Sequence, residues 1–232
     1  KKKLMEIDPD NDEAGIQLAN LYRKLQDYTN AFEMFDSIND PRSNALKLDC
    51  LYYLKDIDRF KALFEELADD EVNPLMGSLI QHANVEYDLG LKNPFCENSI
   101  DYVAHESLFD LGLLDQSLVD ELLLFQEGVH DYTGQPLLSN GKQTGGNIFN
   151  QKHDFLSELA ESLEAYINHY RKKYKNSKEG FLRNFPSNYR LYGWLVNIEP
   201  GGYLKSHIHK EGWLSAAFYL QVPKVKGSEA AI

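Results

Sequence analysis

Between Asp12 and Gly112 the apolar residues recur three and four positions apart, which is the spacing of amphipathic helices. The helices come in pairs, and short polar turns such as "NDPRSN" at 39–44 separate them. The spacing predicts helices over 11–26, 27–38, 44–56, 58–70 and 73–91. The first half of the chain is therefore expected to be all-helical.

The first two helix pairs share an internal spacing. Tyr22 and Ala31 are nine positions apart, as are Tyr53 and Ala62, and the second copy follows the first by 31 residues. Self-similarity at a period of about 20–50 residues is typical of repeat proteins, in which each unit buries its apolar face against the next. The sequence therefore predicts helical repeats.

The first pair resembles a tetratricopeptide repeat. The positions characteristic of that repeat hold Leu18, Ala19, Tyr22, Ala31 and Phe35. In the second copy Cys50, Tyr53 and Ala62 fit, whereas Asp49 stands where Leu is usual. The resemblance implies a helical repeat region over 1–111 that binds a protein or peptide partner.

After residue 111 the pattern changes. Helices are predicted over 112–128 and 152–175, and the Gly-, Asn- and Thr-rich segment between them, 130–151, predicts a long irregular loop. Alternating apolar and polar residues then predict strands over 189–198, 203–209 and 213–223, with "EPGG" as the turn between the first two. A long helix beside antiparallel strands indicates an α+β fold.

The charge balance argues against two classes of partner. The formal net charge is −12 at pH 7, and basic residues cluster only at 1–3 and in "RKKYK" at 171–175. Nucleic acid and anionic membrane surfaces attract clustered Lys and Arg, so we expect neither to bind. No apolar run approaches the roughly 18 residues of a membrane span.

The two cysteines, Cys50 and Cys96, favour a reducing compartment, so an intracellular, cytoplasmic protein is expected. The chain begins without an initiator Met and ends where another strand is expected to begin. We therefore expect it to be a fragment of a longer protein, cut at both ends.

The segment "SHIH" presents His207 and His209 two positions apart on a predicted strand. Side chains at i and i+2 of a strand point to the same face, so both imidazoles can reach one metal ion. Imidazole is a ligand for iron, zinc, copper and nickel. The two residues alone leave open the alternative that they are polar side chains at the start of an ordinary strand.

The surroundings of these histidines resemble the first iron-binding strand pair of the 2-oxoglutarate/Fe(II) dioxygenases, in particular the group often fused to tetratricopeptide repeats. The hallmark of that group is similar to "PGG", then His-x-His, then "WLSG-x-YY-x-x-P". The matching residues are Trp213, Leu214, Ser215, Tyr219 and Pro223. Ala216 replaces a common Gly, and Phe218 replaces a common Tyr.

The resemblance implies a double-stranded β-helix, or jelly-roll, over 112–232, of which this chain holds the N-terminal part. Such a domain would hold Fe(II) through two His and one carboxylate. It would use 2-oxoglutarate and O₂ to oxidise, usually to hydroxylate, a substrate that the sequence does not specify. Three protein ligands leave adjacent positions of the ion open for the keto acid and O₂.

Residue by residue, the resemblance makes His207 the first metal ligand. The family more often has a carboxylate at the position of His209, which is then either a second ligand or a partner of the first. Glu211, in the alternative frame His209-Lys210-Glu211, is the other candidate for the carboxylate. The distal His and the Arg that pairs with 2-oxoglutarate would follow Ile232.

Three further residues, Tyr192, Tyr203 and Ser215, are candidates for contact with the cofactor, although each also fits an ordinary core or edge position. No other catalytic residue is identified. Two other functions stay open: a repeat-based interaction scaffold whose oxygenase-like domain is inactive, and a zinc-binding β-barrel without redox chemistry.

Overall fold

The structure is a computed structural model of the chain and describes residues 12–38, 40–67, 70–129, 132–209 and 212–222. Its internal packing divides the chain into two units. Unit 1 comprises the described residues of Lys1–Tyr102, Ser177–Phe185 and Lys210–Trp213. Unit 2 comprises those of Val103–Asn176, Pro186–His209 and Leu214–Ile232. The expected domain boundary after residue 111 stays a prediction.

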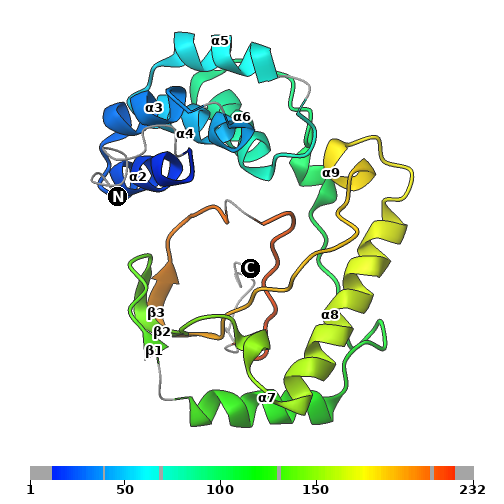
Figure 1. Cartoon of the computed structure of the whole chain (residues 1–232). Helices are drawn as coiled ribbons and strands as arrows, with labels where there is room; N and C mark the ends of the chain where they lie inside the picture. The colour runs from blue at the N-terminus through cyan, green and yellow to red at the C-terminus, as the bar shows by residue number, and fades with distance from the viewer. Residues whose placement is uncertain (1–11, 39, 68–69, 130–131, 210–211, 223–232) are drawn as a thin grey trace. The chain divides into compact units, whose positions relative to one another are not determined.

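Unit 1 is helical (Figure 1). Its longer helices are α2 (Asp12–Lys24), α3 (Tyr28–Asp36), α4 (Asn44–Leu54), α5 (Ile57–Leu67) and α6 (Pro74–Tyr87). They confirm the helices predicted from the apolar spacing. Helix α6 ends before the predicted residue 91 because Asp88 adopts a left-handed conformation with φ of 51°. A single-turn helix, α9 (Gly180–Arg183), was not predicted.

Helices that follow one another in unit 1 pack on one another. Helix α2 contacts α3, α3 contacts α4, and α4 contacts both α5 and α6. Ala19 and Ala31 are fully buried, and their small side chains let α2 and α3 approach closely. Phe35 and Cys50 belong to the same buried cluster. The repeat-type residues of the first helix pair are therefore core residues.

Asp49, which stands where the repeat usually has Leu, is held by an ion pair. Its side chain is 1 % exposed and that of Arg23 is 13 % exposed. Nε of Arg23 donates to Oδ2 of Asp49 at 2.9 Å, and Nη2 bonds the same oxygen. Nη1 donates to Oδ1 of Asn20 at 2.8 Å. The polar substitution is thus matched by a cation from α2, which ties α2 to α4.

The second copy of the repeat spacing packs differently from the first. Tyr53 is 48 % exposed and Ala62 is exposed, whereas Ala31, at the corresponding place in the first copy, is fully buried. Phe60 and Phe64 of α5 fill the core instead. The assignment of these helices to tetratricopeptide repeats therefore stays a prediction.

Unit 2 combines two longer helices with a three-stranded antiparallel sheet in the order β1-β2-β3 (Figure 1). The elements are α7 (Gln116–Gly128), α8 (Asp154–Lys173), β1 (Tyr132–Thr133), β2 (Leu138–Thr144) and β3 (Val196–Leu204). The helices confirm those predicted over 112–128 and 152–175. Leu118 and Leu122 of α7 are buried in one cluster with Leu156 and Leu159 of α8. Unit 2 is compatible with the α+β class.

The "EPGG" segment is not a hairpin turn, so that prediction is wrong. Strand β3 runs through it, and its pairing with β2 shifts between Ser139 and Gly141. Gly201 has φ of +78°, and a Cβ on Gly202 would lie 2.2 Å from the carbonyl oxygen of Asn140. Glycine is needed at both positions, so the segment forms a β-bulge inside a continuous strand.

Other predictions for the loop and the strands are also wrong. Residues 138–144, inside the predicted loop, form β2, because β3 supplies backbone partners for a sequence with little apolar character of its own. Residues 189–195, 205–209 and the described part of 213–223, which were predicted to be strands, contain none, since isolated bonds such as that from the N–H of Thr144 to the carbonyl oxygen of Leu195 do not make a ladder. The three described strands leave the jelly-roll a proposal.

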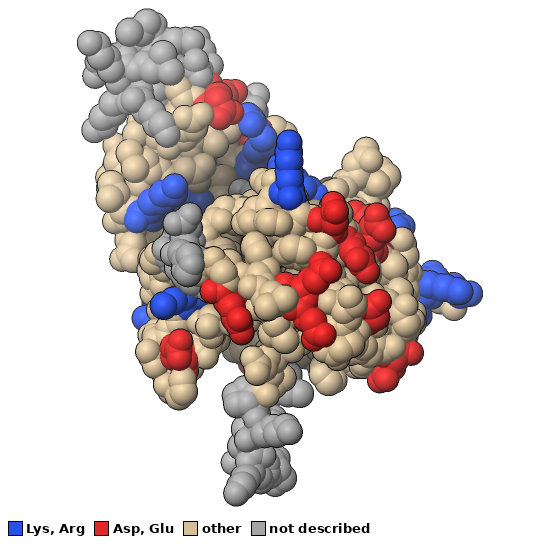
Figure 2. Space-filling model, turned by 90° about the horizontal axis from the view of Figure 1, so that it is seen from below, with Lys and Arg blue, Asp and Glu red and all other residues tan. Residues whose placement is uncertain are grey.

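The exposed sides of α7 and α8 are acidic, except for the basic last turn of α8. Their exposed carboxylates include Asp120, Glu121, Glu127, Glu158, Glu161 and Glu164. In the view of Figure 2 carboxylates gather in one region, while the Lys and Arg side chains lie scattered. Such a surface repels phosphate groups. The expectation that nucleic acid does not bind stays a prediction.

The described helices also bear on the membrane and compartment expectations. None of those helices is both long and apolar enough to cross a lipid bilayer. Cys50 and Cys96 are buried, and neither forms a disulfide with a described residue. The compartment itself stays a prediction.

Candidate functional site

The structure brings His207 and His209 of unit 2 together just beyond the end of β3. Their Nε2 atoms are 3.1 Å apart, and their ring centroids are 4.8 Å apart with the planes at 65°. Both side chains are exposed to solvent. The expected same-side arrangement of the two imidazoles is thus present, although their role as metal ligands stays a prediction.

A backbone carbonyl group sets the orientation of His207. Its Nδ1 lies 2.8 Å from the carbonyl oxygen of Lys205, which can only accept a hydrogen bond. In the neutral ring Nδ1 therefore carries the proton, and Nε2 keeps a bare lone pair. The N–H of Lys205 donates to the carbonyl oxygen of Leu137 at 2.9 Å, which extends the β2–β3 pairing by one bond. Metal-binding histidines have this arrangement, with one nitrogen bonded to a carbonyl and the other bare.

The separation of the two Nε2 atoms fits ligands on one ion. Two imidazole nitrogens bound at about 2.1 Å and at a right angle lie about 3.0 Å apart. The observed 3.1 Å agrees with that value. Without metal the same contact is a hydrogen bond, in which Nε2–H of His209 donates to the bare Nε2 of His207. The donor set therefore fits Fe(II), once His209 has moved its proton to Nδ1.

Aromatic side chains flank His209. The Trp194 ring lies 5.4 Å from the His209 ring at 31°, and the Tyr192 ring lies 4.8 Å from that of Trp194. Partial desolvation, and secondly the charge of His207, lowers the pKa of His209. The neutral imidazole that a metal requires is therefore favoured.

The other predicted site residues are not all gathered at the histidine pair. Tyr192 is joined to it through Trp194. Tyr203 is 55 % exposed on β3, and Ser215 is exposed in the segment after Trp213. Within the described residues, neither Tyr203 nor Ser215 forms a hydrogen bond or ring contact with the histidines. Glu211, the alternative carboxylate, lies outside the described residues.

The described residues offer no third protein ligand beside the pair. No group of three His, Cys, Asp or Glu side chains able to hold a metal occurs among the residues that the structure describes. The pair thus supplies two donors, and a carboxylate would have to come from elsewhere in the chain.

Two residues that support this site were missed from the sequence. Nothing in a sequence marks the Lys205 carbonyl as the partner of His207. Asn147, which bonds the backbone on the N-terminal side of Trp194, lies in a segment predicted to be an irregular loop. Its only sequence signal is its place in the polar run "TGGN".

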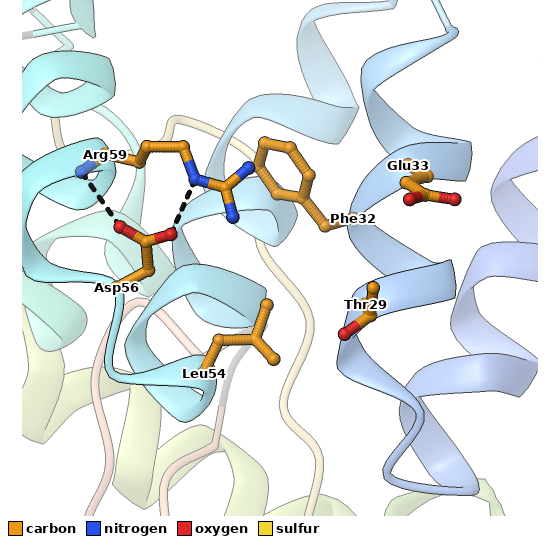
Figure 3. Close-up of a pocket in the computed structure, with 6 residues that line it drawn as sticks. All are labelled: Thr29, Phe32, Glu33, Leu54, Asp56 and Arg59. Atoms are coloured by element: carbon orange, nitrogen blue, oxygen red, sulfur yellow. Dashed lines mark hydrogen bonds and ion pairs between the residues drawn. The ribbon is translucent and has the colours of Figure 1, made fainter.

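Unit 1 contains a separate pocket of about 250 Å³ between α3 and the start of α5 (Figure 3). It is lined by Thr29, Phe32, Glu33, Leu54, Asp56 and Arg59. The Arg59 guanidinium lies 5.0 Å from the centre of the Phe32 ring, and its Nε donates to Oδ2 of Asp56 at 2.6 Å. The pocket has an apolar wall and a charged rim, and it contains no group of metal ligands.

Comparison with known protein families gives a match near the C-terminal end of the chain. Residues 192–232 match a family model described as "Putative 2OG-Fe(II) oxygenase". No curated protein and no solved structure matches the chain. The matched segment contains Trp194, His207 and His209, and it is similar to a family whose cofactors are Fe(II) and 2-oxoglutarate. The match does not extend to the helices of unit 1.

Proposed function

We propose that this chain carries the first part of an Fe(II)- and 2-oxoglutarate-dependent dioxygenase domain. One observation carries the proposal: two imidazole Nε2 atoms 3.1 Å apart, one of them bare by its hydrogen bonding, lie in a segment that matches an oxygenase family. The proposed domain is the jelly-roll over 112–232, preceded by the helical repeat region.

In this proposal His207 and His209 each hold the ion through Nε2. When bound, Fe(II) and 2-oxoglutarate supply an oxidation in which the keto acid, O₂ and a substrate C–H bond give succinate, CO₂ and a hydroxylated product. The Lys205 carbonyl keeps the His207 proton on Nδ1, and Trp194 covers one side of His209. Tyr192, Tyr203 and Ser215 are proposed to line the cofactor site, and Tyr192 contacts Trp194, which adjoins His209.

The test is an anaerobic titration with Fe(II) and 2-oxoglutarate, in which the visible charge-transfer absorption band of the complex is the readout. We expect the band to be lost in His207→Ala and strongly weakened in His209→Ala. His105→Ala, which removes an exposed histidine of unit 2, should keep it. A band that persists in His207→Ala would show that His207 is not a metal ligand.

Glu211→Gln tests whether the two donors are His207 and His209 or, in the alternative frame, His209 and Glu211. The short Nε2–Nε2 contact favours His209 over Glu211 as the partner of His207. We therefore expect Glu211→Gln to keep Fe(II) binding. Loss of binding in Glu211→Gln together with its retention in His207→Ala would establish the alternative frame His209-Lys210-Glu211 instead.

A second candidate function is a repeat-based scaffold with an inactive oxygenase-like domain. The observation that favours it is the lack of a third metal-binding side chain beside the pair, within the described residues. Release of succinate from 2-oxoglutarate in the presence of Fe(II) and O₂, without added substrate, would exclude the scaffold. No succinate and no charge-transfer band would support it.

In either case we propose that the helices of unit 1 recruit a protein or peptide partner. The pocket between α3 and α5 supports this role, because an arginine over an aromatic ring beside two carboxylates can take both apolar and charged side chains. Arg59→Glu, at a side chain that is 58 % exposed on the rim of the pocket, should abolish co-purification of a partner without loss of helical circular dichroism. Unchanged co-purification would contradict the assignment to this pocket.

A further inference from the structure

The Asn147 loop, residues 144–148 from the last residue of β2 into the connection to α8, holds two buried polar side chains that point at the backbone around Trp194. Asn147 is 6 % exposed and Thr144 is 3 % exposed. Oδ1 of Asn147 accepts from the N–H of Gly193 at 3.0 Å, and its Nδ2 donates to the carbonyl oxygen of Leu191 at 2.9 Å. Oγ1 of Thr144 accepts from the N–H of Leu195 at 3.1 Å.

The backbone of the same loop adds two further bonds. The N–H of Ile148 donates to the carbonyl oxygen of Gly193 at 3.0 Å, and that of Thr144 donates to the carbonyl oxygen of Leu195 at 3.0 Å. The residues on either side of Trp194 thus have both their N–H and their C=O groups bonded to the loop. A Cβ on Gly193 would lie 2.8 Å from the Phe149 ring, so this backbone has little room to shift toward the loop.

These bonds determine which way Trp194 faces. Side chains alternate along an extended chain, and accessibility alternates here too: Gly193 and Leu195 are half-buried on the loop side, while Tyr192 and Trp194 are exposed on the other. On that exposed side the Trp194 ring lies against the ring of His209. The loop is therefore connected to His209 through one tryptophan.

We propose that Asn147 and Thr144 are positioning residues for the imidazole pair, acting through Trp194 on His209. The proposal rests on the proposed function, since it concerns the same metal ligands. Neither residue lies in the segment that matches the oxygenase family, which begins at residue 192. Neither touches the histidines, so both act only through the backbone they hold.

The physical reason is that His209, unlike His207, has no hydrogen bond to backbone that fixes its ring within the described contacts. Its orientation depends on Trp194 and on His207. If the Gly193 or Leu195 N–H loses its side-chain acceptor, the backbone is left with an unpaired donor and relaxes. The tryptophan then shifts, and His209 no longer presents Nε2 beside that of His207.

The experiment uses the full chain and has a metal-free arm and a metal arm. The metal-free arm records the ring nitrogens of His209 by long-range proton–nitrogen NMR. The metal arm titrates Co(II) alone and follows quenching of tryptophan fluorescence, since Trp194 adjoins the pair. The variants are Asn147→Ala, the isosteric Thr144→Val, and Thr144→Ser, which keeps the accepting oxygen.

Asn93 of unit 1 provides a matched control. It is 4 % exposed, its Nδ2 donates to the carbonyl oxygen of Gly77 at 2.8 Å, and its Oδ1 accepts from two backbone N–H groups nearby. Asn93→Ala therefore removes the same kind of buried side-chain clamp as Asn147→Ala. It lies in the unit that does not contain the histidines.

We expect Asn147→Ala and Thr144→Val to shift the His209 ring signals and to weaken Co(II) binding about tenfold or more. Thr144→Ser and Asn93→Ala should behave as the wild type. Unchanged His209 signals in Asn147→Ala and Thr144→Val, or equal weakening by Asn93→Ala, would overturn the proposal. If the His209 signals shift but the wild type shows no His207-dependent Co(II) binding, the positioning role stands and the proposed function fails.

Discussion

The ion pair between Arg23 and Asp49 offers a sharp test of how unit 1 is held together. Replacing Asp49 by Leu restores the residue that a tetratricopeptide repeat usually has at this position. It also leaves the Arg23 guanidinium, which is 13 % exposed, beside an apolar group. We therefore expect the repeat-like residue to destabilise this protein.

The expected loss in the free energy of unfolding follows from the burial of the ion pair. Removing one partner of a buried ion pair costs about 3–5 kcal/mol, whereas an exposed pair contributes about 0–1 kcal/mol. Because Arg23 keeps its bond to Asn20, the lower end, about 3 kcal/mol, is expected. With a urea dependence of about 2 kcal/mol per molar, the unfolding midpoint should fall by about 1.5 M.

The assay is urea unfolding followed by far-UV circular dichroism, and a second substitution isolates the charge. Arg23→Met combined with Asp49→Leu removes both charges, so its stability should return to within about 1 kcal/mol of the wild type. Arg42→Met is the exposed control, since the Arg42 side chain is 64 % exposed in its pair with Asp40. A single Asp49→Leu variant as stable as Arg42→Met, or a double variant less stable than the single one, would refute the reasoning.

Three other predictions concern unfolding and thiol chemistry. Gly202→Ala should lower the free energy of unfolding by about 3 kcal/mol, because its Cβ would meet a backbone oxygen at 2.2 Å. Gly134→Ala, whose Cβ would have nothing within 4 Å, should leave it nearly unchanged. Equal unfolding midpoints for the two variants would contradict the bulge. Burial alone would raise the pKa of Glu106, but hydrogen bonds led by that from Lys173 lower it below the ordinary 4.5. The ionised Glu106 carboxylate therefore stabilises the fold above pH 4.5, and this stabilisation is lost as the pH falls through the lower pKa of the folded state. Glu106→Gln should then make the urea unfolding midpoint less dependent on pH on the acid side. An unchanged dependence would contradict a stabilising role for this carboxylate. Burial raises the pKa of Cys96 to about 12, so alkylation at pH 8 should be about a thousandfold slower in folded than in urea-unfolded protein, and equal rates by mass spectrometry would contradict the buried thiol.

The sequence predicts the helices well because their apolar spacing is itself what the packing uses. Ala19, Ala31 and Phe35, assigned from the repeat resemblance, are all fully buried. Ala62 was assigned by the same spacing and is exposed, because Phe60 and Phe64 take its place in the core. Spacing thus locates a helix more reliably than it identifies which residues of the helix face the core.

The strands and the site depend on partners that are distant in the sequence. "EPGG" suits a turn and a bulge equally, and only the pairing of β3 with β2 decides between them. The approach of His207 to His209 agrees with the expected same-side arrangement, although both residues lie beyond the end of β3 and not on the predicted strand. The bonds that orient them, from the Lys205 carbonyl and from the Asn147 loop through Trp194, involve backbone groups that no residue type reveals.

Long-range proton–nitrogen NMR of the His207 and His209 rings during titration with Zn(II), a diamagnetic substitute for Fe(II), tests whether the two imidazoles bind one metal ion. We expect metal-free His207 to carry its proton on Nδ1 in the neutral ring, as its 2.8 Å contact with the Lys205 carbonyl requires. We also expect zinc to shift Nε2 of both rings together, at one equivalent. A proton on Nε2 of metal-free His207, or a zinc shift confined to one of the two rings, would contradict these expectations.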